Sequence, residues 1–149
     1  MMTQRYRMKN KMRILGIDYG DRRIGLAVSD MLLITSQPIG FISITGDKDA
    51  LLKLEPYIKE YSVDKIVLGL PKNMDGTEGE RAEKTRRFSE KLIKKFNIPI
   101  DFFDERMTTI SAERTLNDMN IRGTDKKKGK KDMLSAAIIL QSYMLTIKR

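Results

Sequence analysis

The hydrophobic pattern along this chain switches between two kinds of segment. Residues 14–17 and 66–70 contain no polar side chain, and such short apolar runs are typical of strands buried on both sides of a sheet. Elsewhere apolar residues recur three or four positions apart, as at Leu51, Leu54 and Ile58, which predicts a helix with one buried face. The alternation of these two patterns predicts an α/β domain.

In chain order the pattern predicts three strands, then a helix, a strand, a helix, a strand and two further helices. Only a short turn separates the strand that ends at Asp18 from the strand at 23–29, so the two should form an antiparallel hairpin. The third strand is expected at 32–34 and 40–44, with a bend near Pro38. The remaining elements are helices at 47–61, at 80–96 behind a capping box of Thr77 and Glu80, near 110–119 and at 132–147, with strands at 65–71 and 98–103.

Polar residues follow the strands that should run parallel to one another. The strand at 65–71 is reached through a helix, so the crossover places it parallel to the first strand. In open α/β sheets the functional site lies at the carboxyl ends of such strands. Asp18 ends the first strand, Lys72 follows the second, and Glu105 follows the last. These side chains should therefore meet at one edge of a mixed sheet.

The composition narrows the chemistry that such a site can perform. The 149 residues suit one domain at 12–149, preceded by a basic arm at 1–11 that we expect to be flexible. The chain has no cysteine and no histidine, which excludes disulfides, thiolate or histidine nucleophiles and histidine-bound zinc. No apolar run is long enough for a membrane span or a signal peptide, and we expect a cytoplasmic protein with no membrane partner.

The net charge of +9 is concentrated in a few places. The arm at 1–11 is basic, Arg22 and Arg23 follow Asp18, and a lysine run at 126–131 precedes Asp132. A solvated surface would explain any single lysine. Clusters beside candidate catalytic acids instead favour a polyanionic partner, and nucleic acid is the predicted one.

Three carboxylates form the candidate catalytic centre. Asp18 and Glu105 end strands, and Asp132 should start the final helix on the stripe that faces the sheet. Converging carboxylates repel one another unless a hard cation neutralises them, and oxygen ligands suit Mg²⁺ or Mn²⁺. One or two such ions could support phosphodiester hydrolysis without histidine. Each acid also has an ordinary interpretation, as a helix cap for Asp132, an ion pair for Glu105 and a turn acceptor for Asp18.

Five ordered motifs resemble one family. They are Gly16-Ile-Asp-Tyr-Gly20, Ile24-Gly-Leu-Ala-Val28, Val67-Leu-Gly-Leu-Pro-Lys-Asn-Met-Asp-Gly-Thr77, Asp104-Glu-Arg-Met-Thr108, and Lys131-Asp132 with Ser135-Ala-Ala-Ile-Ile-Leu140. Together they resemble the YqgF (RuvX-type) family of RNase H-fold nucleases over nearly all of residues 12–149. The resemblance implies an RNase H-like fold, a five-stranded mixed sheet with helices on both faces, and catalytic, metal-binding roles for Asp18, Glu105 and Asp132.

The resemblance also implies a function. The family is linked to maturation of the 5′ end of pre-16S ribosomal RNA and, by fold, to Holliday junction resolvases. Our leading hypothesis is a Mg²⁺- or Mn²⁺-dependent nuclease that cuts structured RNA in ribosome biogenesis, with precursor ribosomal particles as possible partners. The same chemistry on four-way DNA junctions, which favours a homodimer over a monomer, is one alternative. A non-catalytic RNA-binding assembly factor is the other.

The hypothesis assigns backbone-phosphate contacts to a set of cations around the carboxylates. The set comprises Arg22, Arg23, Lys72, Arg106, Lys126, Lys127, Lys128, Lys130 and Lys131.

Overall fold

A computed structural model describes residues 13–110, 114 and 128–147; of residues 128–131 it describes the backbone alone. The basic arm at 1–11 and most of the predicted helix at 110–119 lie outside the described residues. The described elements are β1 (Ile14–Tyr19), β2 (Arg23–Ser29), β3 (Ser36–Ser43), α2 (Asp47–Glu60), β4 (Lys65–Leu70), α3 (Glu80–Phe96), β5 (Ile100–Asp104), the 3₁₀ turn η1 (Glu105–Met107) and α5 (Lys128–Ile147).

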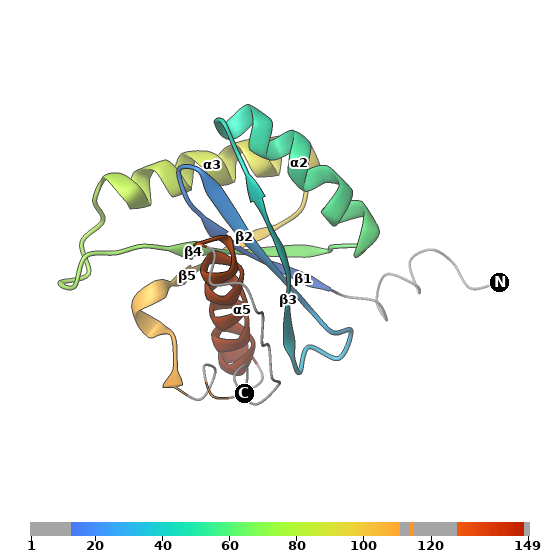
Figure 1. Cartoon of the computed structure of the whole chain (residues 1–149). Helices are drawn as coiled ribbons and strands as arrows, with labels where there is room; N and C mark the ends of the chain where they lie inside the picture. Colours follow the sequence, from blue (N-terminus) through green and yellow to red (C-terminus); the bar gives the residue numbers. More distant parts are fainter. Residues whose placement is uncertain (1–12, 111–113, 115–127, 148–149) are drawn as a thin grey trace.

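The strands form one mixed sheet in the order β3-β2-β1-β4-β5 (Figure 1). The pairs β1–β2 and β2–β3 are antiparallel, and β4 lies parallel to both β1 and β5. The predicted hairpin and the predicted parallel crossover are therefore confirmed. Because β1, β4 and β5 run the same way, their carboxyl ends lie at the same edge of the sheet.

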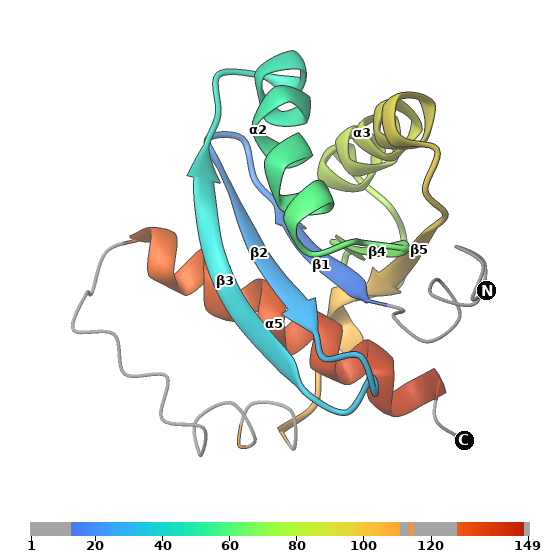
Figure 2. The ribbon, with the colours of Figure 1, turned by 90° about the vertical axis from the view of Figure 1, so that its right-hand side faces the viewer.

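Helices cover both faces of this sheet, as expected. Figure 2 shows α2 and α3 on one face and α5 across the other. Alternate residues of β1 divide between the two cores: Leu15 and Ile17 pack with the α2 and α3 side chains, whereas Ile14 packs with those of α5. Both faces of the central strand are thus apolar, which is the physical reason for its uninterrupted hydrophobic run. No helix among the described residues is long and apolar enough to cross a membrane.

Three glycines allow α5 to lie close against the sheet. A side chain at Gly16 would place its Cβ 2.8 Å from Leu140 Cβ, and one at Gly69 would lie 2.7 Å from Ile139 Cδ1. At Gly25 the Cβ would come within 2.0 Å of the Asp132 carbonyl oxygen. Neighbouring strands β2, β1 and β4 therefore each leave room for α5, whose backbone comes close at Gly25 and Gly16 and whose Ile139 side chain fills the space at Gly69.

The far end of α5 is fixed by a polar cluster. The Tyr143 hydroxyl donates to a carboxylate oxygen of Asp101 on β5, and Lys65 Nζ on β4 lies 2.8 Å from the same carboxylate. Tyr143 also packs edge-to-face against Phe103. The helix is thus held on two strands at the opposite end from Asp132.

Three expectations about local structure are wrong. Residues 32–34 form a turn instead of strand, because the Asp30 carboxylate accepts hydrogen bonds from the backbone N–H groups of Ile34 and Thr35. The strand itself starts at Ser36, and the expected irregularity near Pro38 is confirmed by a register shift opposite Leu26 and Ala27.

The predicted capping box does not form. The N-cap of α3 is Gly79, without a side-chain hydrogen bond, and Thr77 instead uses its hydroxyl in the preceding turn, donating to Asp75 and accepting from Asn73. The final helix also begins earlier than expected, at Lys128 instead of Asp132. Lysine is a good helix former, and the helix includes Lys128, Lys130 and Lys131 despite Gly129 between them.

We predict that Gly25→Ala destabilises the protein, because the added methyl group must push the Asp132 backbone away from β2. Overpacking of this kind costs about 1–3 kcal/mol, measurable as a lower free energy of unfolding in urea. The matched control is Gly79→Ala, whose Cβ would meet Asn73 at an ordinary 3.6 Å. Equal effects of the two substitutions would contradict this account of the glycine.

Candidate active site

The three predicted carboxylates come from three separate elements of the sheet edge. Asp18 is the last but one residue of β1, Glu105 is the first residue after β5, and Asp132 lies in the second turn of α5. Asp18 pairs directly with Gly25 in the β1–β2 ladder, so both face α5. The Glu105 side chain crosses Gly69, whose Cβ position lies 3.2 Å from Glu105 Cγ. The glycines that admit α5 thus also make room for the carboxylates.

Electrostatics show that the structure brings these acids together. Burial, and after it the negative charges of Glu105 and Asp132, together raise the pKa of Asp18 to about 7. Burial also raises the pKa of Glu105, and neighbouring Asp104 adds to the effect. Negative charge therefore accumulates around Asp18 in a partly desolvated place, where an oxygen-seeking cation would relieve it.

Asp132 is held by an ion pair in this arrangement. Arg23 Nε lies 2.9 Å from Asp132 Oδ2, and both side chains are about one-third exposed (33% and 29%). Since the helix begins four residues earlier, Asp132 is not its N-cap. Among the described residues no three acidic side chains are arranged closely enough to hold a metal ion as they stand. The carboxylate oxygens of the three acids are the ligands that a hard cation such as Mg²⁺ prefers. In the structure, however, Asp132 is bound to Arg23.

Sequence reasoning missed Arg81, which lies in the first turn of α3. Its guanidinium donates to the Tyr19 carbonyl and to Asp21 Oδ1, both at 2.7 Å. Its positive charge offsets part of the rise in the pKa of Asp18 and of Glu105. Only topology could have indicated it, because a helix that follows β4 must start at the edge where β4 ends.

Besides Arg23, two more of the predicted phosphate-binding cations are paired with acids in the structure. Arg106 forms hydrogen bonds to both carboxylate oxygens of Asp104, at 2.7–3.1 Å, and reaches the Met74 carbonyl at 3.3 Å. Lys72 Nζ lies 4.0 Å from Glu78. Both contacts shape the loop between β4 and α3.

The structure describes the side chain of only one of the remaining predicted cations, Arg22. Arg22 is exposed in the β1–β2 turn and has no ion pair within the described part of the chain. Lys126 and Lys127 lie outside the described residues, and Lys128, Lys130 and Lys131 lie in the first turn of α5, where only the backbone is described.

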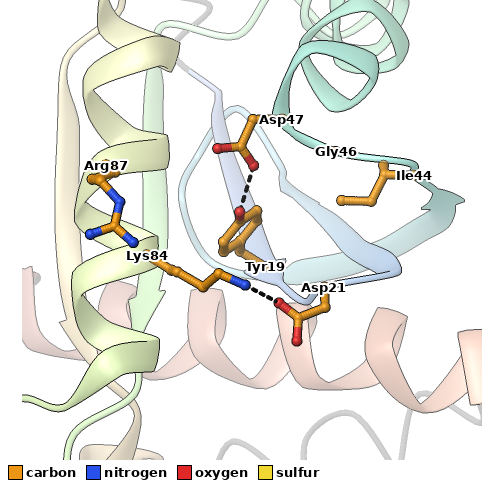
Figure 3. Close-up of a pocket in the computed structure, with 7 residues that line it drawn as sticks. All are labelled: Tyr19, Asp21, Ile44, Gly46, Asp47, Lys84 and Arg87. Carbon is orange, nitrogen blue, oxygen red and sulfur yellow. Dashed lines mark hydrogen bonds and ion pairs between the residues drawn. The ribbon is translucent and has the colours of Figure 1, made fainter.

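A pocket of about 230 Å³ lies on the other face of the sheet, between the β1–β2 turn, the start of α2 and α3 (Figure 3). Tyr19 fills one wall, stacked on Phe88 at 4.3 Å between ring centroids and donating its hydroxyl to Asp47. Lys84 is turned to Asp21 across the pocket (Figure 3). None of the three carboxylates lines this pocket, because Asp18 faces the opposite side of β1 from Tyr19.

The chain is similar to known proteins in both sequence and structure. A family model described as "RuvX: Holliday junction resolvase" matches residues 12–146. A protein of Ruminiclostridium cellulolyticum named "Putative pre-16S rRNA nuclease" is 48% identical over 134 residues, covering 89% of this chain and 94% of that protein. A relative of the same name from Streptococcus thermophilus is 42% identical over 135 residues, covering 89% of this chain and 97% of its own.

Among solved structures, Thermus thermophilus RuvC in complex with a Holliday junction substrate superposes with a TM-score of 0.63. The alignment covers 92% of this chain and 97% of that one, at 13% sequence identity. This likeness concerns the fold alone, and it confirms the expected RNase H-like architecture. The family match covers nearly the whole chain, and on that ground the chain belongs to the RuvX family.

Proposed function

We propose that this chain is a metal-dependent nuclease that hydrolyses phosphodiester bonds in structured RNA, with the 5′ end of pre-16S rRNA as its substrate. The observation that supports the proposal is the placement of Asp18, Glu105 and Asp132 at the carboxyl edge of the sheet, where burial and then the charges of Glu105 and Asp132 raise the pKa of Asp18 to about 7. The names of the relatives support the choice of RNA substrate.

In this proposal Asp18, Glu105 and Asp132 would hold one or two Mg²⁺ or Mn²⁺ ions. When bound, such an ion makes water a stronger nucleophile and stabilises the charge that develops on the phosphate. Asp18 is the central ligand, because its pKa responds to both of the other carboxylates. Arg81 holds the backbone directly after Asp18 through the Tyr19 carbonyl, which fixes the direction of the Asp18 side chain.

The cations around the site would bind the backbone without reading the sequence of the RNA. Arg22 is exposed beside the site, and the first turn of α5 brings Lys128, Lys130 and Lys131 to the same edge as Asp132. We keep Lys72 and Arg106 as secondary contacts, since each also holds an acid of the loop. Lys126 and Lys127, which lie outside the described residues, stay in the proposed set of phosphate contacts.

The second candidate is cleavage of four-way DNA junctions. The family description supports it, as does the likeness to a RuvC that binds a Holliday junction. Two cuts in such a junction require two active sites and therefore a symmetric dimer. A monomer that cuts RNA would decide against it.

We predict that Asp18→Asn abolishes cleavage, with a loss of at least about 100-fold, because an amide cannot supply the negative charge that a divalent ion requires. The assay uses end-labelled pre-16S 5′ leader RNA and a four-way DNA junction, each with Mg²⁺ or Mn²⁺. The matched control is Asp49→Asn, since Asp49 pairs with Lys53 on α2, away from the site.

The substrates distinguish the candidates. Cleavage of RNA by wild type and by Asp49→Asn, but not by Asp18→Asn, is the expected result. Cleavage of the junction alone would support the resolvase. Tight RNA binding without cleavage by any variant would favour the non-catalytic assembly factor.

We predict that the stabilising effect of Asp18→Asn grows as the pH rises. The pKa of Asp18 is about 7 in the folded chain against 3.8 in a model peptide, so the folded state binds a proton more tightly. Its contribution to stability therefore falls as the pH rises from about 4 to 7. An asparagine at this position does not ionise, so the variant does not lose stability in this way. The unfolding free energy of Asp18→Asn minus that of wild type should therefore increase by roughly 2–3 kcal/mol from pH 5 to pH 8.

Urea denaturation in EDTA at the two pH values measures this difference. Added Mg²⁺ should stabilise wild type at pH 8 and leave Asp18→Asn unchanged. An advantage that is the same at both pH values would show that Asp18 titrates normally.

We predict that RNA binding weakens steeply with salt, because each neutralised phosphate of a single strand contributes about −0.7 to the log–log slope. Arg22→Gln should make the slope shallower by about that amount. Fluorescence anisotropy from low to high KCl measures it. A slope that Arg22→Gln does not change would remove this residue from the interface.

A further inference from the structure

Arg23 is in direct contact with Asp132, one of the candidate metal-binding acids. It is the first residue of β2, two positions before Gly25 and on the same face of the sheet, so its side chain points toward α5. There its Nε donates to Asp132 Oδ2 at 2.9 Å. An arginine that starts one strand is thus bound to an acid more than a hundred residues later in the chain.

This contact keeps Asp132 from serving as a free ligand. A carboxylate that accepts a hydrogen bond from a guanidinium offers one oxygen less to a metal ion, and the guanidinium charge repels that ion. The described residues contain no group of three acids in position for a metal, although Asp18 responds to the charges of both Glu105 and Asp132. In the structure Asp132 is therefore bound to Arg23 as well as contributing to the charge around Asp18.

Arg23 is also held less firmly than the other arginines near the site. Arg81 has two hydrogen bonds, from separate nitrogens, to the Tyr19 carbonyl and Asp21, and Arg106 grips both oxygens of Asp104. Within the described part of the chain Arg23 makes its one ion pair through Nε, so its two Nη groups have no partner there. With its side chain about one-third exposed, Arg23 can change partners without unfolding anything.

We infer that Arg23 is an exchangeable counter-ion: it neutralises Asp132 in the cation-free protein and passes to a phosphate oxygen of the nucleic-acid backbone when a divalent cation takes Asp132. The inference rests on the proposed function. Guanidinium groups bind carboxylate and phosphate with the same fork of donors, so the two partners are interchangeable. A divalent cation that takes Asp132 releases Arg23 for the phosphate, and a phosphate that binds Arg23 frees Asp132 for the cation. Each ligand therefore strengthens the binding of the other, and by the same factor.

The coupling gives Arg23 opposite effects on the two ligands. Without nucleic acid, Arg23→Gln should tighten binding of Mn²⁺ by about fivefold or more, because no guanidinium competes for Asp132. With nucleic acid, the same variant should lose most of the mutual enhancement between Mn²⁺ and RNA. A residue that only stabilised the fold would weaken both.

The experiment is calorimetric titration of Mn²⁺ into wild type, Arg23→Gln, Arg23→Lys and Arg22→Gln, all as the full chain without RNA. Arg22→Gln is the matched control, since it removes the same charge from the neighbouring position, where no ion pair is present in the described structure. Asp18→Asn tests whether the titrated ion is bound at the carboxylates. Circular dichroism confirms that each variant is folded.

The expected result is tighter Mn²⁺ binding by Arg23→Gln, an intermediate constant for Arg23→Lys, and less than a twofold change for Arg22→Gln. Equal changes in the two glutamine variants would reduce the effect to general charge and overturn the exchange. So would an unchanged constant in Arg23→Gln. If wild type binds no Mn²⁺, both the metal-dependent function and the exchange are overturned. If wild type binds Mn²⁺ and Asp18→Asn does not, the proposed function stands even when the Arg23 variants show no effect.

A second measurement follows the guanidinium itself. The Nε–Hε resonance of Arg23, assigned by its absence in Arg23→Lys, should shift when Mg²⁺ is added to the ¹⁵N-labelled protein, because its acceptor is lost. The Nε–Hε resonance of Arg106, bound to Asp104, serves as the internal control and should stay in place. An Arg23 resonance that Mg²⁺ saturation leaves unmoved would overturn the exchange.

Discussion

The close approach of α5 to the sheet is the constraint on which the candidate site depends. Gly16, Gly25 and Gly69 lie on three neighbouring strands and present no side chain to the helix. A methyl group at any of them would meet helix atoms at 2.0–2.8 Å, closer than real Cβ contacts allow. The helix can bring Asp132 to the carboxyl end of β1 because this part of the sheet is bare.

That approach concentrates charge in a place with little water. Asp18 lies between the helix and the sheet edge, and burial is the largest cause of its raised pKa. Arg23 and Arg81 compensate from opposite sides, one bound to an acid of the site and the other to the backbone beside it. These side chains offset part of the negative charge, and the pKa of Asp18 nevertheless stays raised to about 7.

Sequence reasoning predicted the elements that periodicity determines. The buried strands, the hairpin, the parallel crossover and the sheet edge at which Asp18 and Glu105 lie all follow from apolar runs and connection lengths, and the structure has them. The stripe containing Asp132 was also correct, since Ala136, Ile139, Leu140 and Tyr143 are buried. The same reasoning interpreted the glycines only as parts of motifs, because the need for a bare surface appears only when the helix is in place.

Choices between competing polar partners could not be predicted. Arg23, Lys72 and Arg106 have the same charge, and their nearness to the candidate acids assigned all three to phosphate, whereas each has an acid within 4.0 Å in the structure. For Arg23 that acid is Asp132, which is distant in sequence and lies nearby only in the fold. The Thr77 hydroxyl could likewise have capped the helix or bonded within the preceding turn. In the structure it accepts from Asn73 and donates to Asp75, both in the turn. Local sequence indicates which groups can bond, and tertiary structure decides which of them do.

The anchoring of α5 at Tyr143 sets a limit on how the length of this chain can vary. The helix is fixed to β4 and β5 at one end and presents Asp132 at the other. One residue inserted between these points would turn Asp132 by about 100° around the helix axis and carry it away from Asp18. A residue inserted before Lys128 leaves both ends in register. Over evolution, insertions and deletions should accumulate ahead of the helix and be absent from the part that joins the anchor to the acid.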